Sequence, residues 1–445
     1  MTMLKLTTAR IAVLLGALLF GAVAQAQLVV DITRGQENAV PVAVVPFGWT
    51  GTDVAPFDVA QVIASDLHRS GRFEPVDLDK MVDRPTTGQE IRFDEWRSYI
   101  RTDFIVVGKL MAQGADRYAA QFELYNVLNG QRLAGTEPGR ELTATAPSLR
   151  ALSHRISDII YEKLTGVRGA FSTRIAYVTA EGTPPKQQYK LIVADYDGEN
   201  AKIIRDQDEP IMSPAWSPDG AQLAYVSFEG KMSAIYVQTL RTAERTRVSA
   251  RAGINGAPSW SPDGSTLALT LSRKDGDVDI YTLKLQSQEL KRMTFDPGID
   301  TEPTWSADGR KLYFNSDRAG SPQIYEIDVA SPERATRITF DGPYNARPRL
   351  SPDGKQLAVV LQDNGNFRIG AVDLKSRSVR VLSDGRQDES PSFAPNGAMV
   401  IYATQVRGRG RLATAGVDTQ FQQTLKAQGD ADQREPVWSP FPAGR

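Results

Sequence analysis

The strongest constraint on this chain is a six-fold repeat that fills its C-terminal part. Each copy contains a proline, one variable residue and a bulky apolar residue, and the bulky residues recur at intervals of 44, 45, 45, 43 and 45 residues. Four-stranded propeller blades repeat at about 40–50 residues. The spacing therefore predicts an array of small sheets that presents a surface. The copies are Pro214-Ala-Trp216, Pro258-Ser-Trp260, Pro303-Thr-Trp305, Pro348-Arg-Leu350, Pro391-Ser-Phe393 and Pro436-Val-Trp438.

Turn chemistry follows each bulky residue. The sequence Trp-Ser-Pro-Asp-Gly occurs at 216–220 and 260–264, and variants of it occur at 305–309, 350–354 and 393–397. Proline presets the first corner of a turn, aspartate bonds to its own backbone, and glycine accepts a positive φ. Apolar strands follow these turns, so each unit is expected to supply a four-stranded sheet that must bury both faces against its neighbours.

The two ends of the array complement each other. Arg174-Ile-Ala-Tyr-Val178 matches the second strand of the repeat but has no Pro-x-Trp before it, whereas the sixth Pro-x-Trp has no second strand after it. We therefore expect residues 436–439 to complete the first blade and close a six-bladed ring. An open solenoid is the alternative, although it would leave apolar end faces. The repeated tryptophans are expected to pack as wedges between blades.

The N-terminus has the pattern of an export signal. Lys5 and Arg10 precede an apolar run at 11–24, which ends in the small-residue motif Ala24-Gln25-Ala26. Residues 1–26 are therefore predicted to be a signal peptide cleaved between Ala26 and Gln27, with the mature protein in the periplasm. An uncleaved membrane anchor is the alternative. The sequence contains no cysteine, which excludes disulfides, thiolate metal sites and cysteine nucleophiles.

Three further regions differ in their pattern of apolar and polar residues. Residues 27–38 begin with Leu28-Val-Val-Asp-Ile32 and become polar, which favours a flexible partner-binding segment, with a permanently docked edge strand as the alternative. Residues 39–166 alternate strand patterns with helical patterns at 58–70 and 148–164, which predicts an α/β domain. A joint at 166–170 then leads into the propeller, predicted at 171–445. The predicted fold class is thus an N-terminal α/β domain followed by an all-β six-bladed propeller.

Several function classes lack support in the sequence. The 52 basic and 53 acidic residues give a net charge of −1 without a basic block, which disfavours nucleic acid as a partner. Only His68 and His154 are present, both expected to be ordinary surface or capping residues, and no G-x-S-x-G motif occurs. The acidic turns Asp195-Tyr-Asp197-Gly198 and Asp275-Gly-Asp277-Val-Asp279 lack a full calcium ligand set and are expected to be hairpins. No catalytic residue, metal site or cofactor is predicted, and a periplasmic hydrolase and a glycan-binding propeller stay open as alternatives.

Several stretches of the sequence resemble the TolB family of the Tol-Pal system. They include Val44-Val-Pro-Phe47, Glu162-Lys-Leu-Thr-Gly166, Thr173-Arg-Ile-Ala-Tyr-Val178, Met212-Ser-Pro-Ala-Trp-Ser-Pro-Asp-Gly220, Asn255-Gly-Ala-Pro258, Thr301-Glu-Pro-Thr-Trp305 and Ala394-Pro-Asn-Gly397. The resemblance covers essentially the whole chain after the signal peptide. The repeat is only moderately specific, since prolyl-peptidase propellers carry similar turns, whereas its combination with the α/β domain is highly specific.

The resemblance implies a non-enzymatic periplasmic adaptor without a cofactor. It would bind the outer-membrane lipoprotein Pal through the propeller face and the C-terminal domain of TolA through its N-terminal segment. It would support outer-membrane integrity and constriction at cell division. The resemblance also implies that colicin translocation domains can bind it. The TolA-binding residues would be Leu28, Val30, Asp31 and Ile32. The residues of the Pal face would be Met212, Ser213, Ile254, Asn255, Thr301, Glu302, Asn345, Arg347, Glu389 and Arg434.

Overall fold

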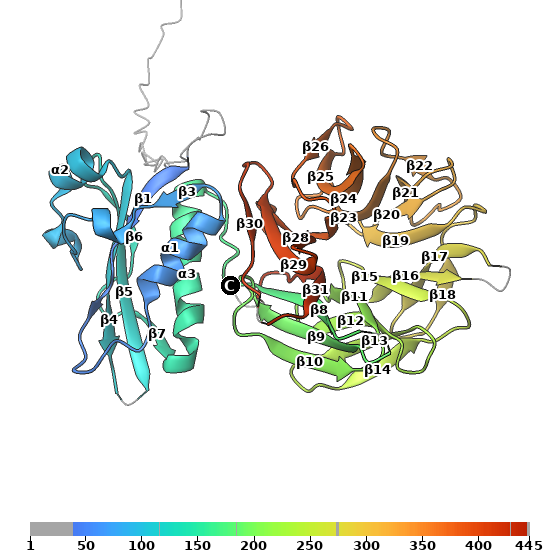
Figure 1. Ribbon diagram of the computed structural model, residues 1–445, viewed down its shortest axis with the longest axis horizontal. Coiled ribbons are helices and arrows are strands. Elements are labelled where there is room, and N and C mark those ends of the chain that lie inside the picture. The colour runs from blue at the N-terminus through green and yellow to red at the C-terminus, as the bar shows by residue number, and fades with distance from the viewer. Residues whose placement is uncertain (1–38, 115, 184, 273–275, 428, 443–445) are drawn as a thin grey trace, which may run out of the picture.

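The computed structural model describes residues 39–442 except 115, 184, 273–275 and 428. An α/β domain and a β-propeller lie side by side, joined by the segment after helix α3 (Figure 1). Among the described residues, no helix is long and apolar enough to cross a membrane. The predicted signal peptide, its cleavage site at Ala26 and Gln27, and the segment with Leu28, Val30, Asp31 and Ile32 lie outside the described residues.

The N-terminal domain is built on a seven-stranded mixed sheet. Its main path runs β3-β1-β4-β5-β6, with β2 added to β4 and β7 added to β5. Strand β1 is parallel to both β3 and β4, whereas β4 and β5 form a long antiparallel pair. The strands are β1 Val40–Val44, β2 Gly48–Trp49, β3 Phe73–Pro75, β4 Phe104–Ala112, β5 Arg117–Asn126, β6 Arg132–Gly135 and β7 Leu142–Thr145.

Two amphipathic helices cover the face of this sheet that is turned toward the propeller (Figure 1). Helix α1 (Val59–Arg69) begins where the Asp58 side chain accepts a hydrogen bond from the amide of Gln61 at 2.9 Å. Helix α3 (Leu149–Thr165) ends at Gly166, whose φ of 74° suits a left-handed cap. Both helices were predicted from their apolar spacing. The short helical turns are Leu78–Lys80, Gly88–Glu90, α2 Phe93–Glu95, the π-helical turn Trp96–Ile100 and Ala146–Ser148.

The propeller consists of six four-stranded antiparallel sheets. Blade 1 has the order β10-β9-β8-β31, and the other five each use four consecutive strands. Blade 1 contains β8 Arg174–Glu181, β9 Gln188–Asp195, β10 Lys202–Gln207 and β31 Asp432–Trp438. Blade 2 contains β11 Ile211–Trp216, β12 Gln222–Ser227, β13 Ala234–Thr239 and β14 Arg245–Ser249. Blade 3 contains β15 Asn255–Trp260, β16 Thr266–Ser272, β17 Val278–Lys284 and β18 Leu290–Arg292.

The remaining blades follow the same plan, with the bulky residue of each repeat at the end of the innermost strand. Blade 4 contains β19 Asp300–Trp305, β20 Lys311–Ser316, β21 Gln323–Asp328 and β22 Thr336–Arg337. Blade 5 contains β23 Asn345–Leu350, β24 Gln356–Asp363, β25 Asn366–Asp373 and β26 Val379–Val381. Blade 6 contains β27 Glu389–Phe393, β28 Met399–Val406, β29 Arg409–Gly416 and β30 Gln422–Thr424.

The C-terminal strand closes the ring. Strand β31 pairs antiparallel with β8, so that Trp438 lies opposite Ile175 and Val437 lies opposite Ala176. Ser439 continues the pairing, because its amide bonds to the carbonyl of Arg174 at 2.8 Å. This confirms the six-bladed propeller and the predicted completion of blade 1, and it excludes the open solenoid.

The repeated tryptophans are wedges between blades, as predicted. The indole nitrogen of Trp260 donates to the carbonyl of Ala215 at 3.2 Å, and that of Trp305 donates to Ser259 at 3.1 Å. Ala215 and Ser259 are the variable residues of the preceding Pro-x-Trp motifs. Trp216 bonds in the same way across the closure, to the carbonyl of Val437 at 3.1 Å. The same interblade hydrogen bond therefore recurs at Trp216, Trp260 and Trp305, whereas the indole of Trp438 donates to the hydroxyl of Thr173.

The two domains meet at the turn side of blades 1 and 6. The ring of His68 packs edge-on against Phe421, with the two ring centroids 5.4 Å apart. The side-chain amide of Asn396 donates a hydrogen bond to the backbone carbonyl of Arg168 at 3.0 Å. His68 is partly exposed, as expected, whereas His154 is only 2% exposed and lies 2.8 Å from Asp66. The expectation of a surface or capping role was therefore wrong for His154, because a buried carboxylate provides its hydrogen-bond partner.

Candidate partner-binding face

The strand order places the predicted face at the end of the propeller away from the N-terminal domain. Antiparallel neighbours reverse direction at every turn, so the Pro-Asp-Gly turns and the loops that enter the innermost strands lie at opposite ends. Asn396, in the turn after β27, touches the interdomain segment through Arg168. The entry loops before β11, β15, β19, β23, β27 and β31 therefore form the opposite rim.

A ring of backbone distortions lies just inside this rim. The residue before each repeated proline has a left-handed backbone, which is strained for any residue except glycine. In all six innermost strands the pairing register also shifts at this point, as at a β-bulge, which redirects a side chain. The φ values are 50° for Ser213, 44° for Ala257, 55° for Glu302, 52° for Arg347, 55° for Ser390 and 50° for Glu435.

Charged side chains converge on the propeller axis at this ring. Glu302 accepts a hydrogen bond from Arg349 at 2.9 Å and lies 3.9 Å from the Nε atom of Arg347. Arg347 also donates to the hydroxyl of Ser390, and Glu435 accepts from the amide of Ser213. Together these residues line one narrow hollow. Residues from blades 2, 4, 5, 6 and 1 thus meet at a polar throat.

Burial and charge shift the acid–base properties of the throat. Burial alone would raise the pKa of Glu302, but Arg347 and Arg349 outweigh it and lower that pKa below the ordinary value. Burial raises the pKa of Glu435, which Arg347 only partly offsets. The throat therefore combines a carboxylate held firmly ionised with a second one that is easier to protonate.

Apolar side chains are exposed on one sector of the rim. Met212, Met232 and Ile254 are 38%, 55% and 48% exposed, and they surround a hollow of about 380 Å³ between blades 2 and 3. Contiguous exposed apolar surface on a soluble domain marks an interaction site. The two methionines add flexible, polarizable contacts that adapt to different partner shapes.

Two exposed aromatic residues on the rim were not identified from the sequence. Phe295 and Phe340 are 55% and 62% exposed, in the loops that lead into β19 and β23. A guanidinium lies over each ring, Arg292 at 5.0 Å and Arg337 at 5.1 Å. The repeated Thr-Phe-Asp at 294–296 and 339–341 was the available signal. A turn alone gives no reason for an aromatic residue at the same place in two blades, so this repetition could have indicated an exposed contact residue.

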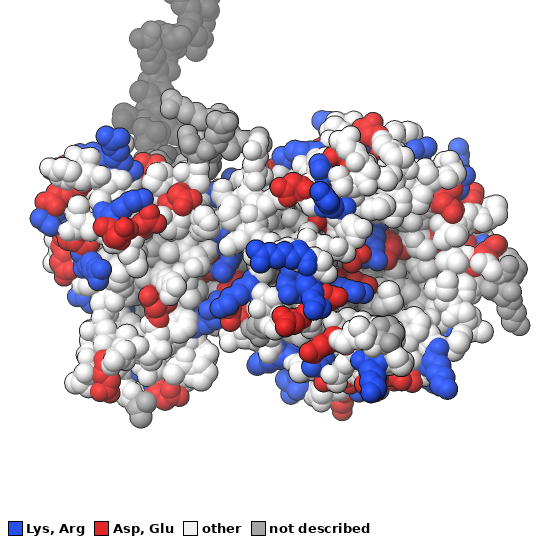
Figure 2. All heavy atoms as spheres, viewed as in Figure 1, with Lys and Arg blue, Asp and Glu red and all other residues white. Residues whose placement is uncertain are grey.

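A second, more polar hollow of about 550 Å³ opens between blades 5, 6 and 1. Arg347, Glu389 and Arg434 line it together with uncharged residues such as Gln405. The rim thus offers an apolar sector on one side of the axis and a charged sector on the other. Over the side of the molecule in view, acidic and basic side chains are interspersed, without a continuous field of one sign (Figure 2).

The residues predicted for the face fall into three groups by exposure. The buried members Asn255 and Asn345 begin strands β15 and β23 and bond to the loops before them: Asn255 donates to the carbonyl of Arg251 at 2.7 Å, and Asn345 donates to the carbonyl of Asp341 at 2.7 Å. They can therefore shape the rim without reaching a partner. The exposed members are Met212, Ile254, Glu389 and Arg434, and the half-buried members are Ser213, Thr301, Glu302 and Arg347.

Comparisons with known proteins agree along the chain. The family "TolB beta propeller domain" matches residues 161–442, and "TolB amino-terminal domain" matches residues 28–133. The crystal structure of TolB from Acinetobacter baumannii superposes with a TM-score of 0.83 at 38% identity, over 92% of this chain and 98% of that one.

Curated relatives give the same assignment over a shorter stretch. The Tol-Pal system protein TolB of Thioalkalivibrio sulfidiphilus is 48% identical over 233 residues, and that of Xanthomonas oryzae pv. oryzae is 48% identical over 238 residues. These matches cover 52% and 53% of this chain and the same shares of the relatives, so the chain spans about half the length of the curated relatives it matches. From the two family matches, which together cover both domains, the chain belongs to the TolB family of Tol-Pal system proteins.

Proposed function

We propose that this chain is a non-enzymatic periplasmic adaptor of the Tol-Pal system. It binds the lipoprotein Pal through the rim of the propeller and the C-terminal domain of TolA through residues 27–38. By holding an outer-membrane partner and an inner-membrane partner, it supports outer-membrane integrity and constriction at cell division. The observation that carries the proposal is the exposed apolar sector of the rim beside a charged throat, on a chain of the TolB family.

The chemistry of the rim suits a folded protein partner. Interfaces combine an apolar centre with polar, solvent-accessible surroundings, and a few anchor residues contribute most of the binding energy. Met212, Met232 and Ile254 provide the apolar centre, while Glu389 and Arg434 provide charged surface on the other side of the axis. A rim of this kind favours a docked domain over a small polar ligand.

The buried polar residues do not support a hydrolase. Ser157, His154 and Asp66 lie together, but the Ser157 hydroxyl donates to Asp66 at 2.7 Å and not to the imidazole. In a Ser-His-Asp triad the serine donates to the histidine, which acts as its base. All three side chains are also sealed from solvent, with Ser157 and Asp66 at 0% exposure. The cluster therefore has the contacts of a structural network.

The Pal site is tested by placing a charge in the apolar sector. Ile254→Asp should weaken binding of the soluble domain of Pal at least tenfold by calorimetry, because it puts a carboxylate into the apolar hollow. Val381→Asp is the matched control, since Val381 is 43% exposed on the outermost strand β26, away from the rim. Equal affinity of the two variants would refute the assignment of the face. Retention of the protein on purified sacculi lacking Pal would instead favour glycan binding.

The TolA site is tested by truncation. Deleting residues 27–38 should abolish binding of the C-terminal domain of TolA and leave Pal binding measurable with a changed affinity. If the segment and the rim are coupled, linkage requires each partner to change the affinity for the other by the same factor. Undiminished TolA binding after the deletion would refute the role of this segment.

A further inference from the structure

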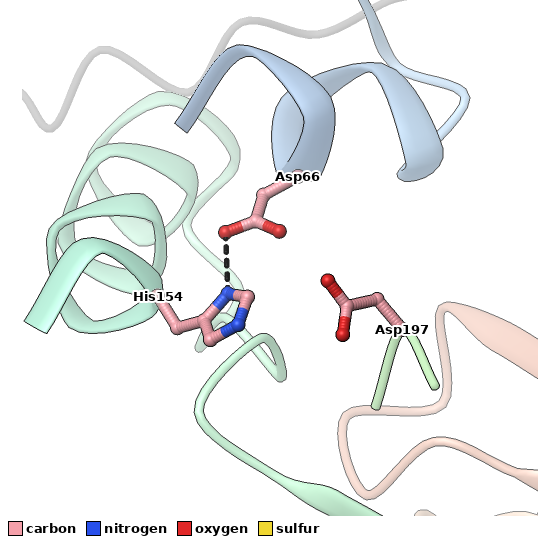
Figure 3. Close-up of side chains that lie close together, drawn as sticks. All are labelled: Asp66, His154 and Asp197. Atoms are coloured by element: carbon pink, nitrogen blue, oxygen red, sulfur yellow. Dashed lines mark hydrogen bonds and ion pairs between the residues drawn. The ribbon is translucent and has the colours of Figure 1, made fainter. Parts of the chain in front are cut away.

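A buried polar cluster joins the two domains where α1 and α3 meet the turn between β9 and β10 (Figure 3). Asp66 of α1 has three partners: the Nδ1 atom of His154 at 2.8 Å, the hydroxyl of Ser157 at 2.7 Å and the hydroxyl of Tyr196 at 2.7 Å. An ionised carboxylate only accepts hydrogen bonds, so Nδ1 of His154 carries a proton. Tyr196 belongs to the propeller, and the cluster therefore spans both domains.

The propeller turn contributes two more carboxylates to the cluster. Asp197 accepts hydrogen bonds from Arg150 and, at 3.4 Å, from Arg69. Asp195 lies 3.7 Å from the Nε atom of Arg150. Both arginines come from the N-terminal domain, Arg69 from α1 and Arg150 from α3. The sequence had suggested only a hairpin at 195–198, and the structure shows that this hairpin is one side of an interdomain ion network.

The protonation state of His154 decides whether the charges of the cluster balance. The ionisable groups that face the imidazole are Asp66 and Arg69 from α1, Arg150 from α3, and Asp195, Tyr196 and Asp197 from the propeller. The neutral imidazole leaves three carboxylates with two guanidinium groups. The protonated imidazole supplies a third cation. Since the His154 side chain is only 2% exposed, solvent cannot supply a counter-charge in its place. Its Nε2 atom is buried without a hydrogen-bond partner among the described residues.

We propose that protonated His154 is a latch that holds the N-terminal domain on blade 1, and that deprotonation weakens this docking. Burial by itself lowers the pKa of His154, but Asp66, with smaller contributions from Asp197 and Asp195, outweighs burial and raises it above 6.5. Burial and Asp66 raise the pKa of Tyr196 well above its ordinary value, so Tyr196 does not titrate in this range.

The sign of the effect follows from the two carboxylates that docking brings to the imidazole. Asp66 lies in the same domain as His154 and stays beside it when the domains separate, whereas Asp195 and Asp197 of the propeller face it only in the docked state. These two carboxylates favour the protonated form, so the latch contributes at low pH and is lost as the pH rises through the raised pKa of His154. Each unit of difference in pKa between the docked and undocked states changes the ratio of these states by about tenfold.

A bound cation is the competing account of the same cluster. The ligand atoms of Asp66, His154 and Asp197 lie within 4.8 Å of one another. However, Arg69 and Arg150 already bond to Asp197, and a divalent cation would place two further positive charges beside them. The charge balance therefore favours a proton over a metal ion.

The test combines a direct titration with hydrogen exchange on the full chain. The sequence has only two histidines, so proton NMR of the imidazoles resolves both, and His68→Gln identifies the His154 signal. Hydrogen exchange of the Phe171 amide, which bonds to the Asp158 carboxylate of α3 at 2.7 Å, reports opening of the joint even when the open state is rare. Exchange in strand β16, far from the joint in blade 3, serves as the internal reference.

The latch predicts that His154 titrates above 6.5. It also predicts that protection of the Phe171 amide, relative to the intrinsic exchange rate, falls across that titration, by about tenfold for each unit by which docking raises the pKa of His154. His68→Gln should retain the fall, whereas His154→Gln, which still offers an amide donor to Asp66 but cannot titrate, should remove it. A titration at or below 6.5, or an unchanged fall in His154→Gln, would overturn the proposal. A fall that disappears with a chelator and returns with zinc would assign the cluster to a metal instead.

Discussion

Replacing Trp438 with alanine tests whether the C-terminal strand closes the propeller. The indole is 4% exposed, stacks on Tyr196 with ring centroids 6.1 Å apart, and donates to the hydroxyl of Thr173 at 2.7 Å. Removing a buried tryptophan costs about 3–5 kcal/mol. The Thr173 hydroxyl keeps its own bond to the carbonyl of Ala170, so little further penalty arises from an unpaired donor. Against a typical stability of about 5–15 kcal/mol, this loss is large.

Urea unfolding followed by circular dichroism measures this loss without relying on tryptophan fluorescence. Trp438→Phe is the matched variant, because it keeps most of the apolar area but cannot donate to Thr173, and it should cost less than the alanine variant, with about 1 kcal/mol from the hydrogen bond. A loss below about 1 kcal/mol in Trp438→Ala would show that the closing strand does not hold the ring, because a buried wedge cannot be removed so cheaply.

Two further substitutions test the charges of the propeller. Arg318→Ala should lower the free energy of unfolding by about 3–5 kcal/mol, because it leaves the fully buried Asp300 without its cation. The control is Arg310→Ala, which should change the free energy of unfolding by less than about 1 kcal/mol, since the Arg310 side chain is 83% exposed. Similar effects of the two substitutions in urea unfolding would contradict this account. Glu302 has a lowered pKa, so its ion pairs contribute stability above about pH 4.5, and this stability is lost as the pH falls through the lowered pKa. Glu302→Gln should remove this part of the acid dependence of stability. A thermal-unfolding profile between pH 3 and 6 that is the same in Glu302→Gln and the unsubstituted protein would contradict this role of Glu302.

The residue patterns predicted most of the fold, including the long-range ring closure, and they failed for contacts that leave no mark in a local pattern or in the repeat. Helix α1 was predicted because its apolar residues recur at helical spacing, and the ring closure because one end of the array lacked a strand that the other end had in excess. The apolar sequence Phe-Ile-Val-Val at 104–107 predicts a short buried strand, and the structure extends it to Ala112 as β4, since its pairing with β5 continues beyond the fully buried run. His154 and Asp66 are 88 residues apart, and no local pattern links them.

The candidate face shows the same division. The resemblance assigned Ile254 and Arg347 to the Pal face, and the structure shows Ile254 exposed just before β15 and Arg347 within β23 at the throat. The left-handed backbone before each repeated proline was not predicted, because that conformation is unfavourable for residues such as Glu302. The surrounding sheets impose it, and a sequence pattern does not reveal what the tertiary structure imposes.

Hydrogen exchange of the full chain with and without the soluble domain of Pal tests the central claim most directly. The account predicts slower exchange in the rim loops at 250–256, 294–302 and 339–347, and unchanged exchange in the Pro-Asp-Gly turns at the opposite end of the propeller. Protection confined to those turns, or to the N-terminal domain, would place the partner on the wrong side of the ring and contradict the account.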